Sequence, residues 1–469
     1  MSLQAQIKEH ALNAGFDLAG IAPVAAWQDL EFAQTWNERG YGGEMLYLKN
    51  PRRGDPHLIL PSVKSILCVG LVYNTPLPYS TETNCQSSVV SRQLPGSLRR
   101  EASSQPAAAT HEFQTPPALS GVEGRTARSE PSRTAPSAEP RAWISRYAWG
   151  RDYHRVMRIR LERLRAAIEQ LAPGVETRVY VDTGPLLERA FARLSGIGWT
   201  GKNTCLINQQ RGSWFFIGVI LTSLELEPDG PAFDRCGSCR RCLDACPTGA
   251  LVEPYVMDAS RCIAYFNIEL KGSIPAQFRP AIGANVFGCD ICQDVCPWNG
   301  PGEEFEDRNS KIETRKLRPR VTTELPEFYP LTIERPVPTR RASLENANHA
   351  SDGNGQRTPD SGPQTSNSGQ RPFSLFHPRL EDLASLSEDD FRRLFRDSPI
   401  NRVKYRGWLR NLCVAMGNCG DRRFVAWLET MRLHADAVVR EHAEWAIHKL
   451  AQQENGDVAA RGSAPYTAG

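Results

Sequence analysis

The chain has 469 residues, 40% of them hydrophobic and 23% charged, which is enough for two or three domains with their own cores. Its formal net charge of +3 excludes a globally basic nucleic-acid-binding protein, so any RNA surface has to be a local patch. No apolar run approaches the ~20 residues of a membrane-spanning helix. The first residues lack the apolar segment of a signal peptide, so we expect a cytoplasmic protein with no membrane partner.

The amino-terminal half has the pattern of an α/β domain. Apolar residues at helical spacing predict an opening helix, and apolar runs bounded by turn residues predict strands. A longer amphipathic helix and further apolar runs follow later in the chain. The predicted helices cover 2–16 and the later part of 143–171, and the predicted strands cover 17–24, 65–73, 178–182 and 213–223.

Two tracts interrupt this pattern because they are too polar to bury a core. Residues 76–140 are rich in Ser, Thr, Pro, Ala, Gly and Arg and predict a largely disordered insertion, while residues 336–372 predict a linker. Ser387, followed by acidic residues, predicts a helix start in the last hundred residues, where short helix pairs indicate a HEAT-like stack. We therefore expect an α+β multidomain protein. Its predicted parts are a catalytic domain (1–227), a cysteine-rich module (228–300), a connecting segment (301–335), the linker (336–372), a helical domain (373–455) and a disordered tail (456–469).

The cysteines carry the strongest functional signal. Eight of the 13 lie between 236 and 296, and such a cluster in a chain without an export signal indicates metal rather than disulfides. Cys236, Cys239, Cys242 and Cys246 form the C-x2-C-x2-C-x3-C-P run of bacterial two-cluster ferredoxins. In that run the fourth cysteine serves the other cluster.

A second cysteine run is incomplete. Cys289, Cys292 and Cys296 repeat the end of the pattern, Val286 stands where a leading cysteine would be, and Cys262 supplies the missing thiolate. Structural zinc is the alternative, but its cysteines usually come as two C-x2-C pairs. We predict two [4Fe–4S] clusters in a ferredoxin-like module that relays single electrons. The first is held by Cys236, Cys239, Cys242 and Cys296, and the second by Cys246, Cys262, Cys289 and Cys292.

Further segments resemble one family when they are taken together. The ordered parts of the chain look like the epoxyqueuosine reductases, the cobalamin-dependent iron–sulfur enzymes of tRNA queuosine synthesis. The two low-complexity tracts are longer than that family needs. The segments that carry the resemblance are RYAWGRDYH (146–154), VDTGPLLERA (181–190), GIGWTGKNTCLI (196–207), RCIAYFNIELKGSIP (261–275) and CDICQDVCPWN (289–299).

The resemblance implies a reaction, cofactors and partners. Epoxyqueuosine at the wobble position of tRNAs with GUN anticodons loses its epoxide oxygen as water and becomes queuosine, at the expense of two electrons and two protons. The implied cofactors are the two clusters and a cobalamin that rests as cob(II)alamin and works as Co(I). The implied partners are the tRNA anticodon stem-loop and an external electron donor such as a flavodoxin or a ferredoxin. We expect a monomer.

The resemblance also implies site residues in a cobalamin-binding catalytic domain. Asp182 matches the family's catalytic acid and follows a predicted strand, where α/β domains gather their site residues. Such an acid needs a pKa raised by burial, and the alternative role for Asp182 is a helix cap. Cys205 is not needed as a cluster ligand, and we expect it to have a packing role. The alternative for Arg53 is a solvated position on the surface, and the alternative for His154, Leu206 and Ile217 is a structural role. The expected cobalamin contacts are Asp182, Arg53, Asp152, His154, Leu206, Ile217 and Asp290.

A local basic patch predicts contact with RNA. Six basic residues and one acidic residue, Asp421, lie between 402 and 423, and such a patch binds phosphates in a salt-dependent manner. Tyr405 and Trp408 either stack on exposed bases or belong to the helix core. The predicted tRNA contacts are Lys271, Arg402, Lys404, Arg406, Arg410, Arg422 and Arg423.

Two other functions fit parts of the sequence. A reductive dehalogenase uses related cobalamin and double-cluster chemistry, but such enzymes usually carry an export signal. A ferredoxin-like electron carrier or adaptor needs only the clusters. The carrier hypothesis predicts no cobalamin binding and no effect of Asp182→Ala.

Overall fold

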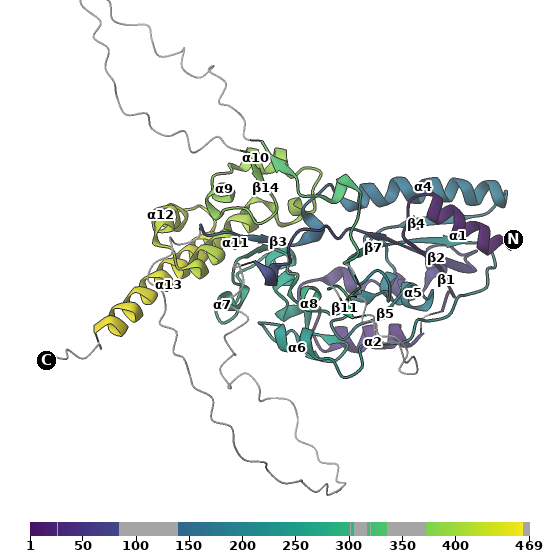
Figure 1. The fold of residues 1–469 in the computed structure, drawn as a ribbon, viewed down its shortest axis with the longest axis horizontal. Helices are drawn as coiled ribbons and strands as arrows, with labels where there is room; N and C mark the ends of the chain where they lie inside the picture. Colours follow the sequence, from purple (N-terminus) through teal and green to yellow (C-terminus); the bar gives the residue numbers. More distant parts are fainter. Residues whose placement is uncertain are drawn as a thin grey trace, which may run out of the picture.

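The structure is a computed structural model, drawn in Figure 1. It describes residues 1–25, 27–83, 139–300, 302–303, 317–318, 320–334 and 372–462. The predicted linker and most of the predicted insertion lie outside the described residues. Within the described residues, no helix is long and apolar enough to cross a membrane.

A four-stranded sheet organises the amino-terminal part of the chain, in the order β1-β2-β7-β4. All three pairs of neighbouring strands are antiparallel. The predicted α/β domain was therefore wrong in the direction of its strands, because apolar runs reveal buried strands but do not show whether neighbouring strands are parallel. The four strands are β1 (Leu18–Ala22), β2 (Ser65–Val72), β7 (Phe215–Thr222) and β4 (Thr177–Tyr180).

Helices cover both faces of this sheet, which explains the continuous apolar runs of its central strands. Every residue of β2 is buried. Alternate residues of this strand face opposite cores: Leu67 packs with residues of α1 and α4, and Ile66 packs with residues of α5. Figure 1 shows α4 lying along the sheet. The covering helices are α1 (Leu3–Asn13), α4 (Tyr153–Leu171) and α5 (Glu188–Leu194), and α2 (Trp27–Glu38) follows β1 in the chain.

The cysteine-rich module consists of short elements joined by tight turns. Its strand β10 pairs in parallel with β3, so the module is tied to the segment that precedes α4. Its helical elements include a five-residue π-helix, η8 (Tyr265–Glu269). The other elements of the module are α6 (Arg241–Ala245), β8 (Leu251–Glu253), β9 (Val256–Met257), α7 (Arg279–Ile282), β10 (Asn285–Phe287) and α8 (Ile291–Asp294). The short strands that precede the module in the chain are β3 (Trp143–Ile144), β5 (Trp199–Thr200) and β6 (Leu206–Ile207).

The carboxy-terminal helices pack around α11, whose residues 408–417 are all buried. The predicted helix start at Ser387 is correct, since Ser387 and Asp390 form a reciprocal capping box. The last helix extends to Gly462, so the predicted tail from 456 began too early. These helices are α9 (Leu380–Ala384), α10 (Glu388–Leu394), α11 (Lys404–Cys419), α12 (Val425–Arg432) and α13 (Ala437–Gly462), and the remaining short strands are β11 (Gly302–Glu303), β12 (Leu317–Arg318), β13 (Thr332–Ile333) and β14 (Phe373–Ser374).

The first residues of the predicted insertion belong to the packed structure. Tyr79 and Ser80 are buried, and the Tyr79 hydroxyl donates to the carbonyl of Asn299 at 2.6 Å. The guanidinium of Arg146 donates to the carbonyls of Leu77 and Pro78 at 3.0 and 2.9 Å. The described chain therefore continues through residue 83, because these few residues pack against the module although the tract as a whole is polar.

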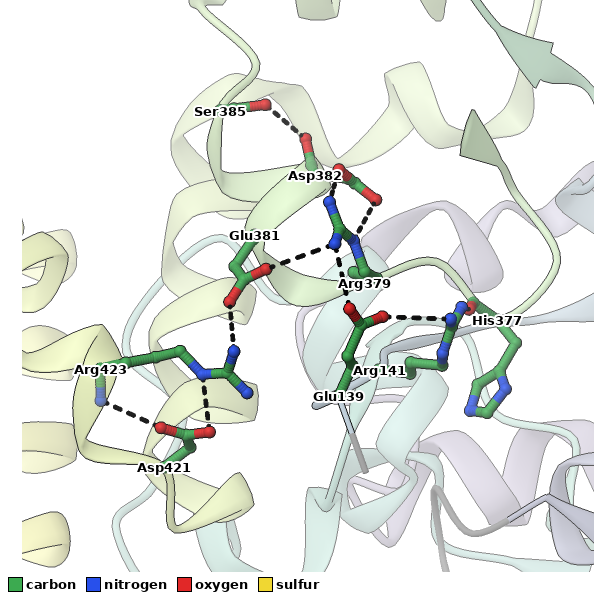
Figure 2. A network of polar contacts seen from close by, with 9 residues as sticks. All are labelled: Glu139, Arg141, His377, Arg379, Glu381, Asp382, Ser385, Asp421 and Arg423. Carbon is green, nitrogen blue, oxygen red and sulfur yellow. Dashed lines mark hydrogen bonds and ion pairs between the residues drawn. The ribbon is translucent and has the colours of Figure 1, made fainter. Parts of the chain in front are cut away.

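A polar network ties the chain after the insertion to the helices (Figure 2). Arg379 Nη1 lies 3.2 Å from Glu139 Oε1, and the Arg379 guanidinium also binds both oxygens of Asp382 at 3.1 Å. Glu381 extends the network to Arg423, whose Nη1 lies 3.0 Å from Glu381 Oε1. Segments far apart in the sequence are thereby joined at one place on the surface.

Candidate functional site

The predicted catalytic residue lies in a loop after the edge strand β4. Asp182 has a φ of 56°, in the left-handed region that non-glycine residues seldom adopt. Its backbone N–H donates to Glu188 Oε2 at 3.0 Å, which holds the loop in this conformation. Because the sheet is antiparallel, the position of Asp182 comes from this loop and not from a shared edge of parallel strand ends.

The first residues of α4 face Asp182. The Tyr153 hydroxyl donates to Asp182 Oδ2 at 2.7 Å, and His154 Nε2 lies 3.7 Å from the same oxygen. Asp152 is the N-cap residue of α4, and its Oδ1 lies 3.0 Å from the His154 backbone nitrogen and 2.7 Å from His154 Nδ1. The GRDYH segment therefore presents an ordered Asp–His pair and a tyrosine to the candidate acid.

The charges around Asp182 favour its ionised form. The contact with His154 lowers the pKa of Asp182 to about 2, and Tyr153 and Arg402 add to this effect against the opposing influence of burial. Burial alone would lower the pKa of His154, but Asp152 and Asp182 outweigh it and raise this pKa to about 9. The sequence analysis requires burial to raise the pKa of a catalytic acid, whereas here the pKa of Asp182 is lowered because two cationic side chains stand beside the carboxylate.

Glu188 and Arg53 complete the buried side of this site. Burial, followed by the charge of Asp182, raises the pKa of Glu188 to about 8, while Arg53 opposes the shift. Three polar atoms here are buried and have no hydrogen-bond partner among the described residues. They are Arg53 Nε, His154 Nε2 and Glu188 Oε1.

Arg402 connects this site to the helical part of the chain. It lies in the 3-10 turn η11 (Pro399–Val403), which leads into α11. Its Nη1 is 3.9 Å from Asp182 Oδ2, and its Nη2 is 3.0 Å from Glu269 Oε1. The sequence assigned Arg402 to RNA binding alone, and it did not single out Tyr153, Glu188 or Glu269. Tyr153 and Glu188 both lie inside the family-like segments, which was the available signal.

The remaining expected cofactor contacts are not part of this group. Leu206 and Ile217 pack in or against the core on the α5 side of the sheet, the structural alternative for both. Asp290 is 1% exposed, and its oxygens accept from Trp143 Nε1, Ser145 Oγ and the backbone N–H of Arg146. The prediction that Asp290 meets the cofactor is therefore withdrawn, because this side chain joins the module to the segment before α4.

The eight cysteines of the two predicted cluster sites lie in two groups. Burial raises the pKa of Cys242 to about 11 and that of Cys296 to about 12, and Cys236 contributes to both shifts. Burial likewise raises the pKa of Cys262 to about 11, with Cys246 as a neighbour. Cys262 and Cys246 in turn contribute to the raised pKa of Cys289. All eight thiols are free of disulfides.

Cys205 lies beside both groups of cysteines. Its thiol is hydrogen-bonded to that of Cys292, and it contributes to the raised pKa values of Cys262 and Cys296. Asn203 fixes this stretch, since its Nδ2 donates to the Cys292 carbonyl at 3.1 Å. The sequence predicted a packing role for Cys205 and gave no signal for this location.

The predicted basic patch is divided in the structure. Arg410 is 1% exposed and donates to the carbonyls of Phe266, Leu270 and Gly272, so its prediction as a tRNA contact was wrong. This side of α11 faces the cysteine-rich module instead of solvent. Arg423 is ion-paired with Asp421 and Glu381 (Figure 2).

Three more of the predicted basic residues lie around Arg402, the residue that reaches Asp182. Lys271 Nζ donates to the carbonyls of Ile268 and Arg402 at 3.1 and 3.5 Å. Burial lowers the pKa of Lys271, and the nearby charges of Arg402 and Lys404 lower it further. Arg406 Nη1 donates to the Lys271 carbonyl at 2.7 Å. We call Lys271, Arg402, Lys404 and Arg406 the basic cluster.

The two aromatic residues of the predicted patch belong to the helical core. Trp408 is fully buried, and Tyr405 donates its hydroxyl to the Leu386 carbonyl at 2.9 Å. Arg422, the last of the predicted contacts, lies in the turn before α12, beside Arg423 and away from η11 in the sequence.

Two grouped sets of thiols beside a buried polar site define an iron–sulfur oxidoreductase. A family model described as a 4Fe-4S double cluster binding domain matches residues 235–299. A second, described as Epoxyqueuosine reductase QueG, DUF1730, matches residues 125–183.

Full-length relatives identify the family. An epoxyqueuosine reductase of Xanthomonas campestris pv. campestris is 32% identical over 446 residues, which cover 94% of this chain and 95% of that protein. One from Pseudomonas aeruginosa is 32% identical over 452 residues, covering 95% and 94%. The chain therefore belongs to the epoxyqueuosine reductase family. The predicted family and class of enzyme are confirmed, and neither alternative function is favoured.

A solved structure agrees with this assignment. It is an epoxyqueuosine reductase with an epoxyqueuosine-modified tRNA-Tyr stem loop, and it superposes with a TM-score of 0.65 at 25% identity. The match covers 99% of this chain and 95% of that one.

Proposed function

We propose that this chain reduces epoxyqueuosine to queuosine at the wobble position of tRNAs with GUN anticodons, and that Asp182 delivers protons to the leaving oxygen. The observation that carries the proposal is Asp182 itself, which is held by Tyr153, His154 and Glu188 next to the basic cluster. The epoxide oxygen leaves as water, so the alkene product forms at the expense of two electrons and two protons. A positioned proton donor lowers the barrier as charge builds on that oxygen.

Cobalamin is the proposed cofactor of this site. Arg53 Nε and Glu188 Oε1 are buried without a hydrogen-bond partner among the described residues, and unsatisfied buried groups of this kind are rare in folded proteins. They are a donor and an acceptor, which suits a ligand whose rim carries amides. When bound and reduced, cobalamin supplies the electron pair that opens the epoxide. The chain's own residues bind it, exclude water and hold the acid.

The clusters have the ligands inferred from the cysteine spacing. Cys236, Cys239, Cys242 and Cys296 hold one, and Cys246, Cys262, Cys289 and Cys292 hold the other. The grouping of their thiols in the structure supports this assignment. The thiols bind iron as thiolates, and the positive charge of the iron offsets the cost of burying these negative charges. A flavodoxin or a ferredoxin is the proposed external donor.

The basic cluster is the proposed contact for the anticodon arm. A related enzyme was solved with a modified tRNA stem loop, and in this chain Arg402 lies 3.9 Å from Asp182, while Lys271 donates to the Arg402 carbonyl. Phosphates bind to such charges largely regardless of sequence. The modified base has to leave the anticodon stack to reach Asp182, and a cationic rim holds the backbone while it does.

An anaerobic turnover assay tests the proposal. The protein with both clusters is incubated with a strong reductant and epoxyqueuosine-containing tRNA, with and without cobalamin, and the nucleosides are then analysed by mass. We expect a cobalamin-dependent loss of one oxygen. Asp182→Asn should lower the rate by about 10²–10⁴-fold, the usual contribution of general acid catalysis. Asp29→Asn, which breaks a peripheral ion pair with Arg193, is the matched control. Unchanged turnover in Asp182→Asn would contradict the proposed role of Asp182.

A further inference from the structure

The proposed acid begins without a proton. The pKa of Asp182 lies at about 2, so this group is a carboxylate at neutral pH. The reaction nevertheless consumes two protons for each epoxide oxygen removed. A neighbouring group therefore has to supply them through Asp182.

The His154 imidazole is held between two carboxylates. Its Nδ1 lies 2.7 Å from Asp152 Oδ1, so the proton on Nδ1 is directed to Asp152 and Nε2 faces the site. Nε2 is 3.7 Å from Asp182 Oδ2, beyond hydrogen-bond distance, and is buried without a partner in the described structure. A small movement of the Asp182 loop would close this gap.

The groups that face this histidine come from two segments, and two further elements act on Asp182. Asp152 and Tyr153 belong to the start of α4, and Asp182 lies in the loop after β4. Glu188 at the start of α5 and Arg402 in η11 act on Asp182 from its other sides. The two carboxylates outweigh burial and raise the pKa of His154 to about 9, so the imidazole is cationic at neutral pH.

We propose that Asp152, His154 and Asp182 form a proton relay in which His154 is the proton reservoir for the reduction of the epoxide. As the C–O bond breaks, the oxygen becomes more basic than imidazole. The N–H bond of His154 Nε2 breaks and an O–H bond forms at Asp182 Oδ2. That O–H bond then breaks as the proton passes to the leaving oxygen, and Asp182 returns to the carboxylate form. The electron pair comes from the reductant of the proposed function, on which this inference rests. A second passage releases water, and His154, 30% exposed, recovers its proton from solvent.

The relay predicts the effect of two substitutions in the loaded enzyme. Asp152→Asn removes a negative charge but keeps a good helix N-cap, so the pKa of His154 should fall toward its ordinary value of 6.5. The parent's single-turnover rate should decline above pH 9, and in Asp152→Asn the decline should begin about two pH units lower. His154→Gln should lower the rate at pH 7 by about 100-fold, leave the KM for tRNA unchanged, and abolish the decline.

NMR gives a readout that does not depend on turnover. In the full chain with oxidised clusters, the imidazole resonance that disappears in His154→Gln should titrate near pH 9 in the parent and nearer 6.5 in Asp152→Asn. His10→Gln, in the last turn of α1, should leave the titration and the pH profile of the parent unchanged.

The outcomes separate the relay from the proposed function. If Asp182→Asn is inactive but His154→Gln keeps the parent's rate and pH profile, only the relay is wrong. A His154 resonance that titrates below pH 7 in the parent would overturn it as well. If Asp182→Asn remains fully active, the proposed function of Asp182 fails first.

Discussion

Glu188 shows how one buried carboxyl group shapes the conformation of its neighbour. It accepts the backbone N–H of Asp182, which holds that residue in the left-handed region where strain is common at functional sites. Its other oxygen is buried without a partner among the described residues. Because its pKa lies at about 8, Glu188 is largely protonated at neutral pH, and a second negative charge beside Asp182 is avoided.

This raised pKa predicts a pH-dependent stability difference. The folded pKa of about 8 exceeds the ordinary value of 4.5, so the stability linked to Glu188 is present below pH 4.5 and is lost as the pH rises to about 8. Glu188→Gln keeps the shape of the side chain and removes this dependence. We expect the melting temperature of Glu188→Gln, measured anaerobically relative to the parent, to rise between pH 5 and 8. Parallel melting curves across this range would contradict the shift.

Helix α11 shows that basic residues close together in the sequence can point to different surroundings in the structure. Its basic residues suggested one patch, yet the helix turns Arg410 and Asn411 toward the cysteine-rich module. Asn411 Nδ2 donates to the carbonyls of Asn267 and Val286 at 2.7 and 2.9 Å. Lys404 remains exposed at the start of the same helix. The helix thus fastens the module with one face and offers charge near Asp182 at its amino-terminal end.

These two roles predict that replacing Arg410 lowers the stability of the protein, whereas replacing Lys404 weakens tRNA binding. Arg410→Met leaves three buried carbonyls without their donor, so we expect destabilisation of about 3 kcal/mol, measured as a fall in melting temperature. Lys404→Met should leave the melting temperature unchanged. It should instead weaken tRNA binding and reduce the slope of log K against log salt by about one. Equal stability of the two variants would show that Arg410 does not fasten the module.

Local patterns were sufficient to predict most elements around the site but not their arrangement. The strands at 65–73 and 213–223 and the amphipathic helix before 171 were predicted because burial on one or both faces leaves a periodic signal. The antiparallel pairing, the left-handed Asp182 and the burial of Arg410 depend on contacts between distant segments. Asp152 and His154 were predicted as cobalamin contacts, and the structure places His154 beside Asp182 and Asp152 beside His154. Tyr153 and Glu188 were missed because a pattern does not show which way a side chain points.

The molecule as a whole sets one cysteine group near the surface and the other near the site. Around Cys236 and Cys239, residues 233–235, 237–238 and 240–241 are exposed, and Phe233 is 82% exposed. Cys262 and Cys289 instead pack against a buried apolar cluster. Cys292, of the same group, is hydrogen-bonded to Cys205, which lies in one of the family-like segments. Electrons should therefore enter at the first cluster and leave from the second.

This order predicts different losses for two cysteine variants. Each of Cys239→Ala and Cys262→Ala should lower the iron content from about eight to about four atoms per chain, because each removes a ligand of one [4Fe–4S] cluster. With a flavodoxin as donor, both should lose turnover. With a small reductant that diffuses to the inner cluster, Cys239→Ala should recover at least about ten-fold more activity than Cys262→Ala, since the path from the inner cluster to the proposed cofactor is intact. Equal recovery in the two variants would contradict the proposed order of the clusters, and greater recovery in Cys262→Ala would reverse it. In either case the exposed loop around Cys236 would not be the entry point for electrons.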